Sequence, residues 1–328
     1  MEASFSNVLI LLFILAAVNY LAQVALQRMK PQLLVEPGMI PQGIQREGFT
    51  DAVVPKEVYL DNEKLYDDFY ASIYDQLTQN VRMTQQKITL IATEWKKTGA
   101  IIEDIDALDA GCGTGIGCAS LANLNVKTVL GVDKSKAMLE RAQTVTLPQS
   151  KLTENQKKKI TFRQGDLLNP SLVGGGAVSH AICLYFTIYY LPDKDAFFRN
   201  MFLWVRPGGE LVVEVVNKYK FDPMLDSASP WVGFSLQKYS KDRVTDSKVS
   251  FDKFDYHGKF DLQDPNAEFR ETFRFKDGGI RRQRHRFTMP SIDEISNSAK
   301  AAGWLYTKYV DLTLIGFEYS YLLFFRHP

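Results

Sequence analysis

LDAGCGTGIG, residues 108–117, places four glycines at alternate positions directly after Asp109, where an apolar strand pattern gives way to a helix pattern. Glycine allows the backbone to turn tightly and to approach a ligand closely. The G-x-G-x-x-G/A spacing of dinucleotide-binding turns is absent, because its last position would fall on Ile116, Cys118 or Ser120. The register that fits is Gly111, Gly113 and Gly115. A carboxylate beside such a loop suits an ammonium group better than a pyrophosphate.

Short apolar strand patterns alternate with helical patterns on both sides of this turn. The expected strands cover 105–110, 126–133, 159–166, 177–186 and 209–216. Such alternation predicts an α/β fold with a doubly wound, Rossmann-like parallel sheet. Ligands of these sheets bind at the carboxyl ends of the strands. The glycine loop follows one of these ends, so we expect the functional site there.

The N-terminal residues have a different character. Val8–Leu26 is a 19-residue apolar run, and spanning a bilayer takes about 20 such residues. Three side chains interrupt it: Asn19, Tyr20 and Gln23. The preceding residues lack the basic charge of a signal peptide, whereas Arg28 and Lys30 follow the run. We therefore predict a membrane anchor over 1–30 that leaves the rest of the chain in the cytosol. A helix lying on the membrane or against another protein is the alternative.

The remaining chain divides into a linker and one domain. Residues 31–56 carry four prolines without periodicity, which predicts an extended linker, and 57–328 form the domain. The domain begins with a helix that has one aromatic face: Tyr66, Phe69, Tyr70, Ile73, Tyr74 and Leu77. After the last expected strand, 217–289 has antiparallel strand patterns with a KDGG hairpin turn. We expect this insertion to form a lid-like layer over the site.

Four arginines gather near the end of the insertion: Arg281, Arg282, Arg284 and Arg286. Two interpretations stay open. These side chains either bind an acidic substrate, a phosphate or an anionic headgroup, or they protect a solvated strand edge from pairing with another chain.

The composition excludes several functions. With 39 basic and 38 acidic residues, the chain lacks the charge of a polyanion-binding protein, so nucleic acid is disfavoured as a partner. The three cysteines, Cys112, Cys118 and Cys183, are odd in number and favour a reducing compartment. The four histidines are scattered, and no Cys/His cluster has metal-ligand spacing, so we expect no metal. The sequence assigns no oligomeric state.

The motifs, taken in order, resemble those of the class I S-adenosylmethionine-dependent methyltransferases from about residue 66 to residue 325. LDAGCGTGIG matches the family's glycine-rich motif, Asp133 in VLGVDKS matches the acidic residue that closes the second strand, and Asp166 in RQGDLL matches the third-strand motif. RPGGELVVEV, residues 206–215, matches the Pro-Gly-Gly turn before the fifth strand.

The resemblance implies a cofactor and residues that hold it. Asp133 would accept the ribose hydroxyls of S-adenosylmethionine, and Asp166 would bind the adenine amino group, with Leu167 packing near the ring. Asp109 and the glycine loop would hold the methionine amino group and backbone. For Asp109 and Asp133, a carboxylate that caps the start of a helix is the alternative.

Further positions match the family less specifically. Tyr70 and Arg82 correspond to residues that close over the cofactor carboxylate, and Tyr185 corresponds to a residue that touches cofactor and substrate. Aromatic side chains at these positions also serve as core residues. No catalytic base follows from spacing, and the candidates are Tyr185, Tyr189, His257 and His285.

The resemblance implies transfer of a methyl group from S-adenosylmethionine. The expected fourth strand lacks an Asn/Asp-Pro-Pro-Tyr/Phe motif, and the chain lacks a paired-glutamate loop, which disfavours base-amine, glutamine and arginine acceptors. We therefore predict a small-molecule or lipid-like acceptor at a membrane. Two alternatives remain: an RNA or protein methyltransferase, and a non-catalytic module that binds the cofactor on the same fold.

Overall fold

The computed structural model describes residues 57–78, 80–223 and 243–328. All of them belong to the second of two compact units, residues 34–328. The predicted anchor over 1–30 and the predicted linker over 31–56 lie outside the described residues.

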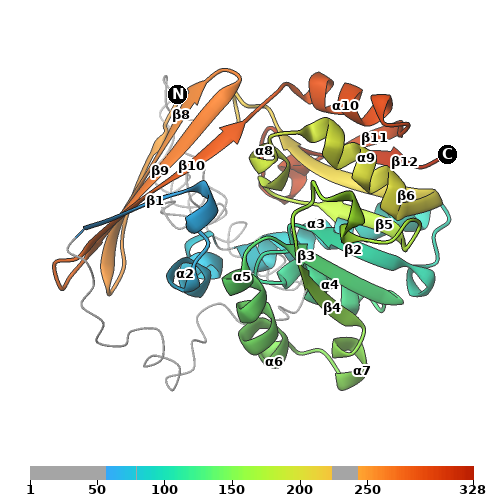
Figure 1. Ribbon diagram of the computed structural model, residues 1–328, viewed down its shortest axis with the longest axis horizontal. Coiled ribbons are helices and arrows are strands. Elements are labelled where there is room, and N and C mark those ends of the chain that lie inside the picture. Colours follow the sequence, from blue (N-terminus) through green and yellow to red (C-terminus); the bar gives the residue numbers. More distant parts are fainter. Residues whose placement is uncertain (1–56, 79, 224–242) are drawn as a thin grey trace, which may run out of the picture. The chain divides into compact units, whose positions relative to one another are not determined.

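A seven-stranded sheet, the central sheet, has the strand order β11-β12-β6-β5-β2-β3-β4 (Figure 1). Its strands are β2 Asp106–Ala110, β3 Thr128–Asp133, β4 Ile160–Gln164, β5 Val178–Cys183, β6 Val205–Val216, β11 Leu305–Asp311 and β12 Ser320–Arg326. The strands from β6 to β4 are parallel, whereas β12 runs antiparallel to β6 and β11. The predicted Rossmann-like α/β fold is confirmed, but the sheet is mixed because β12 reverses direction.

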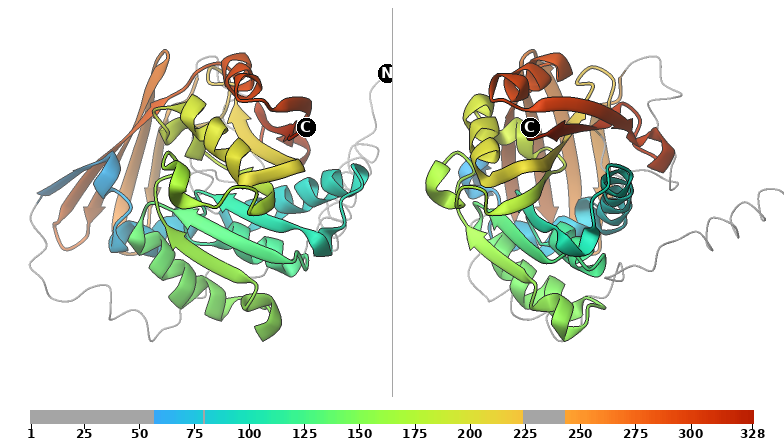
Figure 2. Two further views of the ribbon diagram at one scale, coloured as in Figure 1. Left: turned by 45° about the vertical axis from the view of Figure 1, so that its right-hand side comes forward. Right: turned by 90° about the vertical axis from the view of Figure 1, so that its right-hand side faces the viewer.

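Helices cover both faces of the central sheet. The longer ones are α3 Asn80–Lys97, α4 Ile116–Asn123, α9 Lys194–Trp204 and α10 Ile292–Ala301. The shorter ones are α5 Lys136–Arg141, α6 Leu147–Gln149, α7 Glu154–Lys157, α8 Thr187–Tyr190, η2 Asn62–Lys64, η3 Ile102–Asp104, η4 Ala142–Thr146, η5 Pro170–Leu172 and η8 Leu312–Ile315. Helices α9 and α10 share one buried core with the sheet, and α3 and α4 share another (Figure 2). The sheet is therefore wound on both faces.

A second sheet of five strands, which we call the lid sheet, has the order β1-β10-β9-β8-β7. Its strands are β1 Glu57–Asp61, β7 Asp246–Ser250, β8 Phe254–Gln263, β9 Asn266–Phe275 and β10 Ile280–Thr288. Strands β7–β10 are antiparallel neighbours within the predicted insertion, and KDGG forms the turn between β9 and β10. Strand β1, which sequence reasoning missed, pairs in parallel with β10 (Figure 1).

Helix α2, Asp68–Thr78, packs between the lid sheet and helix α5 in a mainly aromatic core. Its Tyr70 packs with Met138 of α5 and with Phe273 of the lid sheet in this core. Just before the helix, Asp67 caps the backbone N–H of Tyr70 and receives two hydrogen bonds from Arg281, at 2.7 and 3.0 Å. The predicted aromatic helix is thus the support of the lid sheet.

No helix in the described part of the chain is long and apolar enough to cross a bilayer. The longest, α3, has 18 residues, and five of them are charged: Arg82, Lys87, Glu94, Lys96 and Lys97. This finding contradicts the predicted single-pass membrane localisation with a cytosolic domain, which we withdraw. The predicted apolar run Val8–Leu26 itself lies outside the described residues.

Candidate active site

The glycine loop and Asp133 meet at the carboxyl ends of β2 and β3. The backbone N–H of Gly113 donates to Asp133 Oδ2 at 2.8 Å, and that of Ser135 donates to Oδ1 at 2.8 Å. Burial raises the pKa of Asp133, although these N–H groups act to lower it. Gly113 has a φ of +52°, and a Cβ added there would meet no atom within 4 Å. The loop therefore has open space beside Gly113.

At two other positions of the loop, neighbouring side chains leave room only for glycine. A Cβ on Gly111 would lie 2.5 Å from Cγ2 of Thr187, the first residue of α8, and one on Gly115 would lie 2.9 Å from the Cβ of Ala142. Both glycines also have positive φ, of +80° and +79°. The loop is clamped between α8 and η4, which explains why larger residues do not fit.

Asp109 is buried at the end of β2, against the first turn of α4. Its Oδ2 accepts a hydrogen bond from Cys118 Sγ at 3.4 Å, and a Cβ on Gly117 would lie 2.3 Å from the same oxygen. Burial raises the pKa of Asp109 to about 7, and hydrogen bonds from Cys118, which act to lower it, do not offset this effect. Asp109 thus contacts the helix start, as the capping alternative expects.

Asp166 and Leu167 follow the next strand, β4. Asp166 is beside Asp133 in the sheet edge, because the N–H of Gly165 donates to the carbonyl of Asp133 at 3.0 Å. The Asp166 carboxylate accepts from the N–H of Leu168 at 2.9 Å and lies 3.3 Å from Lys134 Nζ. Leu167 is buried in the core. The two predicted acidic residues are therefore brought to neighbouring strand ends.

Tyr185 follows β5 in a strained conformation, with a φ of +55°. Its N–H donates to Glu214 Oε2 at 2.8 Å, and its hydroxyl shares a 2.7 Å hydrogen bond with Thr84. Lys87 Nζ lies 3.9 Å from the ring centroid and 2.7 Å from Glu214 Oε1. Sequence reasoning missed this buried Lys87–Glu214 pair, although a lysine among apolar residues of α3 and a glutamate inside an apolar strand were visible signals.

Tyr70 lies on α2 and Arg82 lies on α3. The Tyr70 ring is buried among Tyr66, Tyr74 and Phe273, which matches the core interpretation. Arg82 is partly buried near the start of α3. Within the described residues, no hydrogen bond or ion pair joins either side chain to the loop.

Tyr189 and His257, two of the four candidate bases, have hydrogen-bond partners of their own, as Tyr185 does. The Tyr189 hydroxyl accepts from the N–H of Val216 at 2.8 Å and lies 3.4 Å from its carbonyl, and burial raises its pKa. It therefore clamps the end of β6. His257 lies on the lid sheet with its Nε2 2.7 Å from Asp246 Oδ1, and both side chains are exposed.

His285 belongs to a continuous hydrogen-bonded chain. The Tyr66 hydroxyl donates to the Tyr190 hydroxyl at 2.8 Å, the Tyr190 hydroxyl is hydrogen-bonded to His285 Nδ1, and His285 Nε2 lies 2.5 Å from Glu271 Oε2. We call these four residues the tyrosine–histidine chain. Sequence reasoning identified only His285 as a candidate base, because its partners come from the segment before α2, from α8 and from β9, and no motif joins them.

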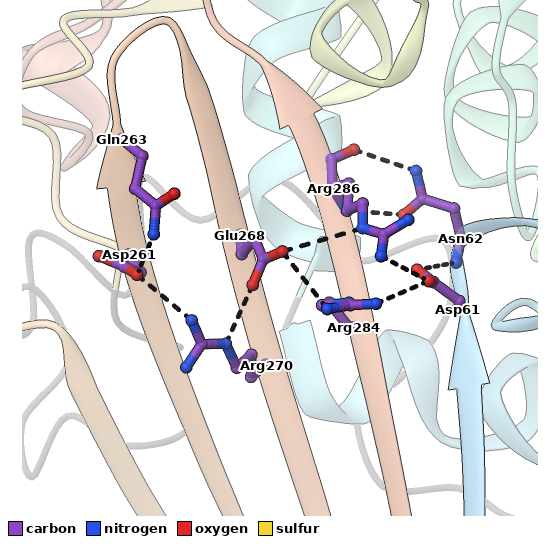
Figure 3. Close-up of polar contacts among 8 residues, drawn as sticks. All are labelled: Asp61, Asn62, Asp261, Gln263, Glu268, Arg270, Arg284 and Arg286. Atoms are coloured by element: carbon purple, nitrogen blue, oxygen red, sulfur yellow. Dashed lines mark hydrogen bonds and ion pairs between the residues drawn. The ribbon is translucent and has the colours of Figure 1, made fainter.

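The arginines of β10 are all paired with carboxylates. On the outer face of the lid sheet, Arg284 and Arg286 lie within 4 Å of Asp61 and Glu268 (Figure 3). Arg282 is paired with Glu57, and Arg281 points inward to Asp67. Strand β10 is not an edge, because β1 covers it. These pairs favour a structural role over the binding of an external anion.

Comparison with known proteins identifies part of the chain. A methyltransferase domain family matches residues 107–209. A mitochondrial ubiquinone biosynthesis O-methyltransferase of Dictyostelium discoideum is 26% identical over 118 residues, which are 36% of this chain and 37% of that protein. A trans-aconitate 2-methyltransferase of Deinococcus radiodurans is 35% identical over 109 residues, which are 33% of this chain and 36% of that protein. The chain spans a little over a third of the length of these curated relatives.

The solved structures extend the fold match. An S-adenosylmethionine-dependent methyltransferase from Clostridium acetobutylicum matches with a TM-score of 0.59 at 18% identity, over 79% of this chain and 98% of that one. The chain therefore carries a methyltransferase domain on the fold of the S-adenosylmethionine-dependent enzymes. The predicted enzyme class is confirmed for the domain over 107–209, and the solved structures support the predicted cofactor, S-adenosylmethionine.

Proposed function

We propose that this chain transfers the methyl group of S-adenosylmethionine to an oxygen atom of a small molecule, at the carboxyl ends of β2–β5 and beneath the lid sheet. The observation that carries the proposal is the glycine loop tied to Asp133, with open space beside Gly113. The names of the two curated relatives support a small acceptor, since one acts in ubiquinone biosynthesis as an O-methyltransferase and the other acts on trans-aconitate.

The proposed cofactor contacts follow the strand ends. Asp133 would bind the ribose hydroxyls, because its carboxylate oxygens can accept further hydrogen bonds beside those from Gly113 and Ser135. Asp166 would bind the adenine amino group on the adjacent strand end, with Leu167 below the ring. Bound there, the cofactor supplies an electrophilic methyl group on a sulfonium, and the protein's task is alignment and the exclusion of water.

Asp109 fits the methionine ammonium through its charge. Within the described residues, its carboxyl is buried without an ion-pair partner, and burial raises its pKa to about 7. A cation nearby would favour the ionised form. Tyr185 is the proposed contact at the methyl-transfer edge, since Thr84 and Glu214 hold it in its strained conformation. Tyr70 and Arg82 stay predictions for the cofactor carboxylate.

Aromatic side chains around α8 favour an acceptor with an apolar or planar body. Phe186 contacts Phe221 and Phe287 with ring centroids 5.4 Å apart, and Tyr190 lies 4.8 Å from Phe287. Such rings bind flat or hydrophobic groups. The proposed class therefore includes hydrophobic and lipid-like small molecules. The paired arginines of β10 offer no support for an RNA substrate.

The test combines binding and turnover. The full chain is titrated with S-adenosylhomocysteine by calorimetry, and then incubated with methyl-labelled S-adenosylmethionine and a panel of catechol, trans-aconitate, an amino sugar, RNA and a protein mixture. We expect cofactor binding and label on an oxygen acceptor, both reduced in Asp133→Ala. Binding without transfer to any acceptor would support the non-catalytic alternative, and label on RNA or protein would contradict the proposed acceptor class.

A further inference from the structure

The tyrosine–histidine chain runs from a partly exposed end to a buried end. Tyr66 and Tyr190 are partly buried, whereas His285 is 3% exposed and Glu271 is 1% exposed. The partly exposed residues come from α8 and the segment before α2, and the buried residues come from β10 and β9. A proton delivered to the tyrosine hydroxyls therefore has a connected path of hydrogen bonds into the lid sheet.

The buried end is built to hold a positive charge. Glu271 accepts hydrogen bonds from Tyr256, at 2.8 Å, and from Gln283. Burial acts to raise the pKa of Glu271, but His285, Gln283 and Tyr256 outweigh it and the pKa is lowered. The His285 imidazole lies against this carboxylate, with Nε2 2.5 Å from Oε2. A buried carboxylate paired in this way stabilises a protonated imidazole.

The partly exposed end contacts the proposed cofactor site. Thr187, at the start of α8, contacts Gly111 closely enough that a Cβ there would clash, and Tyr190 ends the same single turn. Ser135, two residues after Asp133, donates through its hydroxyl to the carbonyl of Tyr66 at 2.6 Å. Tyr190 therefore lies on the helix that packs against the glycine loop, and Tyr66 is hydrogen-bonded to the segment that follows Asp133.

We propose that Tyr190 is a catalytic residue that takes the proton of an acceptor hydroxyl and passes its own proton to His285, with Tyr66 and Glu271 as positioning residues. The inference rests on the proposed function and adds a base to it. As the acceptor oxygen forms its bond to the methyl carbon, the bond from sulfur to that carbon breaks and S-adenosylhomocysteine leaves. The hydroxyl proton moves to the Tyr190 oxygen, and the Tyr190 proton moves to His285 Nδ1. The imidazolium, paired with Glu271, later returns the proton to solvent through the tyrosines.

The chemistry requires one tautomer of His285. Nδ1 must be free of hydrogen to accept from Tyr190, so Nε2–H must face Glu271. A carboxylate beside Nε2 selects this tautomer, because it accepts a hydrogen bond but donates none when ionised. Other titratable groups face the histidine as well: Tyr66, Tyr70 and Tyr190 surround the ring, and Tyr256 shares Glu271. Arg281 is nearby on the same strand, but Asp67 balances its charge.

The first test uses 4-nitrocatechol, whose visible absorbance reports loss of its phenolic proton. The full chain, loaded with S-adenosylhomocysteine, is mixed with this probe and titrated from about pH 5 to about pH 8, a range that brackets the ordinary pKa of histidine. We expect the bound probe to ionise about one pH unit lower on the wild-type protein than on Tyr190→Phe, His285→Gln or Glu271→Gln, as a lost charge partner predicts. Tyr321→Phe, which removes a partly buried hydroxyl from β12, is the control and should behave as wild type.

The second test separates a base from a structural clamp. With catechol as acceptor, Tyr190→Phe should lower kcat by about 10²-fold or more, the contribution of general-base catalysis. With the more acidic 4-nitrocatechol the loss should be much smaller, because this acceptor needs less help to ionise. Affinity for S-adenosylhomocysteine and the melting temperature should stay near wild type.

The outcomes distinguish the two proposals. Failure of the wild-type chain to bind S-adenosylhomocysteine would overturn the proposed function. If the cofactor product binds but the probe ionises at the same pH on wild type and on the folded Tyr190→Phe and Glu271→Gln variants, the tyrosine–histidine chain is only a clamp between lid sheet and central sheet. Equal losses of kcat with both acceptors would contradict the proton transfer in the same way.

Discussion

The central sheet and the lid sheet place their charges differently. A buried ion pair joins helix α3 to the central sheet: the side chains of Lys87 and Glu214 are 1% and 6% exposed, and Glu214 accepts a hydrogen bond from the N–H of the strained Tyr185. On the outer face of the lid sheet, partly exposed charged side chains form a network of ion pairs around Glu268 and Asp61 (Figure 3). The inner face of the lid sheet differs from its outer face, because its Glu271 is buried and only 1% exposed.

This difference in burial determines how much each ion pair contributes to stability. A buried ion pair that loses one partner leaves an unpaired charge in a medium of low dielectric, at a cost of about 3–5 kcal/mol. An exposed pair is screened by water and contributes about 0–1 kcal/mol. We therefore expect variants in the central sheet to have large effects on stability and cofactor affinity, and variants on the outer lid face to have small ones.

The largest effect is expected at the buried pair. Lys87→Met should lower the free energy of unfolding by about 3–5 kcal/mol, because Glu214 is left buried without its cation. The double variant Lys87→Met, Glu214→Leu should regain most of this loss, since it removes both charges. Urea unfolding of the single and double variants measures both values. If Lys87→Met is as stable as wild type, the expected cost of an unpaired buried charge is wrong for this pair.

The next effect depends on pH and on Asp109. The folded state raises the pKa of this acid from 3.8 to about 7, so the protonated form is favoured, and wild-type stability should fall as the pH rises between these values. Asp109→Asn should match wild type near pH 4 and exceed it above pH 7 by up to about 4 kcal/mol, since one pKa unit is about 1.36 kcal/mol. Unfolding curves at the two pH values test the sign.

The same variant tests whether Asp109 binds the methionine ammonium of the cofactor. If the ionised Asp109 holds the methionine ammonium, affinity for S-adenosylhomocysteine should rise up to about tenfold per pH unit below pH 7 and then level off. Asp109→Asn should lose this dependence. An unchanged pH profile would mean that Asp109 serves only the first turn of α4, as its contacts with Gly117 and Cys118 also allow.

A third effect concerns cofactor affinity. Asp133→Ala should weaken binding of S-adenosylhomocysteine by about 1–3 kcal/mol, because it removes a charged acceptor and releases the N–H groups of Gly113 and Ser135. Calorimetry measures the affinity, and a cooperative melt verifies the fold. Wild-type affinity in a folded variant would remove Asp133 from the cofactor site.

The sequence predicted the central sheet better than the lid sheet, for a physical reason. The glycine loop and the acids Asp133 and Asp166 are local motifs, because each follows a strand and faces the same sheet edge. The periodicity also predicted β7–β10 as antiparallel strands. It did not predict β1, a five-residue strand whose identity depends on its parallel partner β10.

The long-range polar pairs could not be predicted from the sequence for the same reason. The sequence separation is 127 residues for Lys87 and Glu214 and 95 residues for Tyr190 and His285. Nothing local to these residues indicates the partner, which the packing of α3, α8 and the lid sheet selects. The sequence marks His285 only as a residue type that can act as a base, and the two interpretations of the arginine strand depend on partners that lie far away in the chain.

The smallest effect is expected on the outer lid face. Arg286 lies 3.1 Å from Asp61 and 3.8 Å from Glu268, but its side chain is 52% exposed. Arg286→Gln should therefore change the free energy of unfolding by less than about 1 kcal/mol, and added salt should shrink the difference further. Cofactor affinity and turnover should match wild type, because the tyrosine–histidine chain lies on the opposite face. A loss of turnover without a loss of stability would instead indicate that the arginines bind an acidic acceptor. Exposed charges on the outer face would then serve function, as we propose for the buried charges.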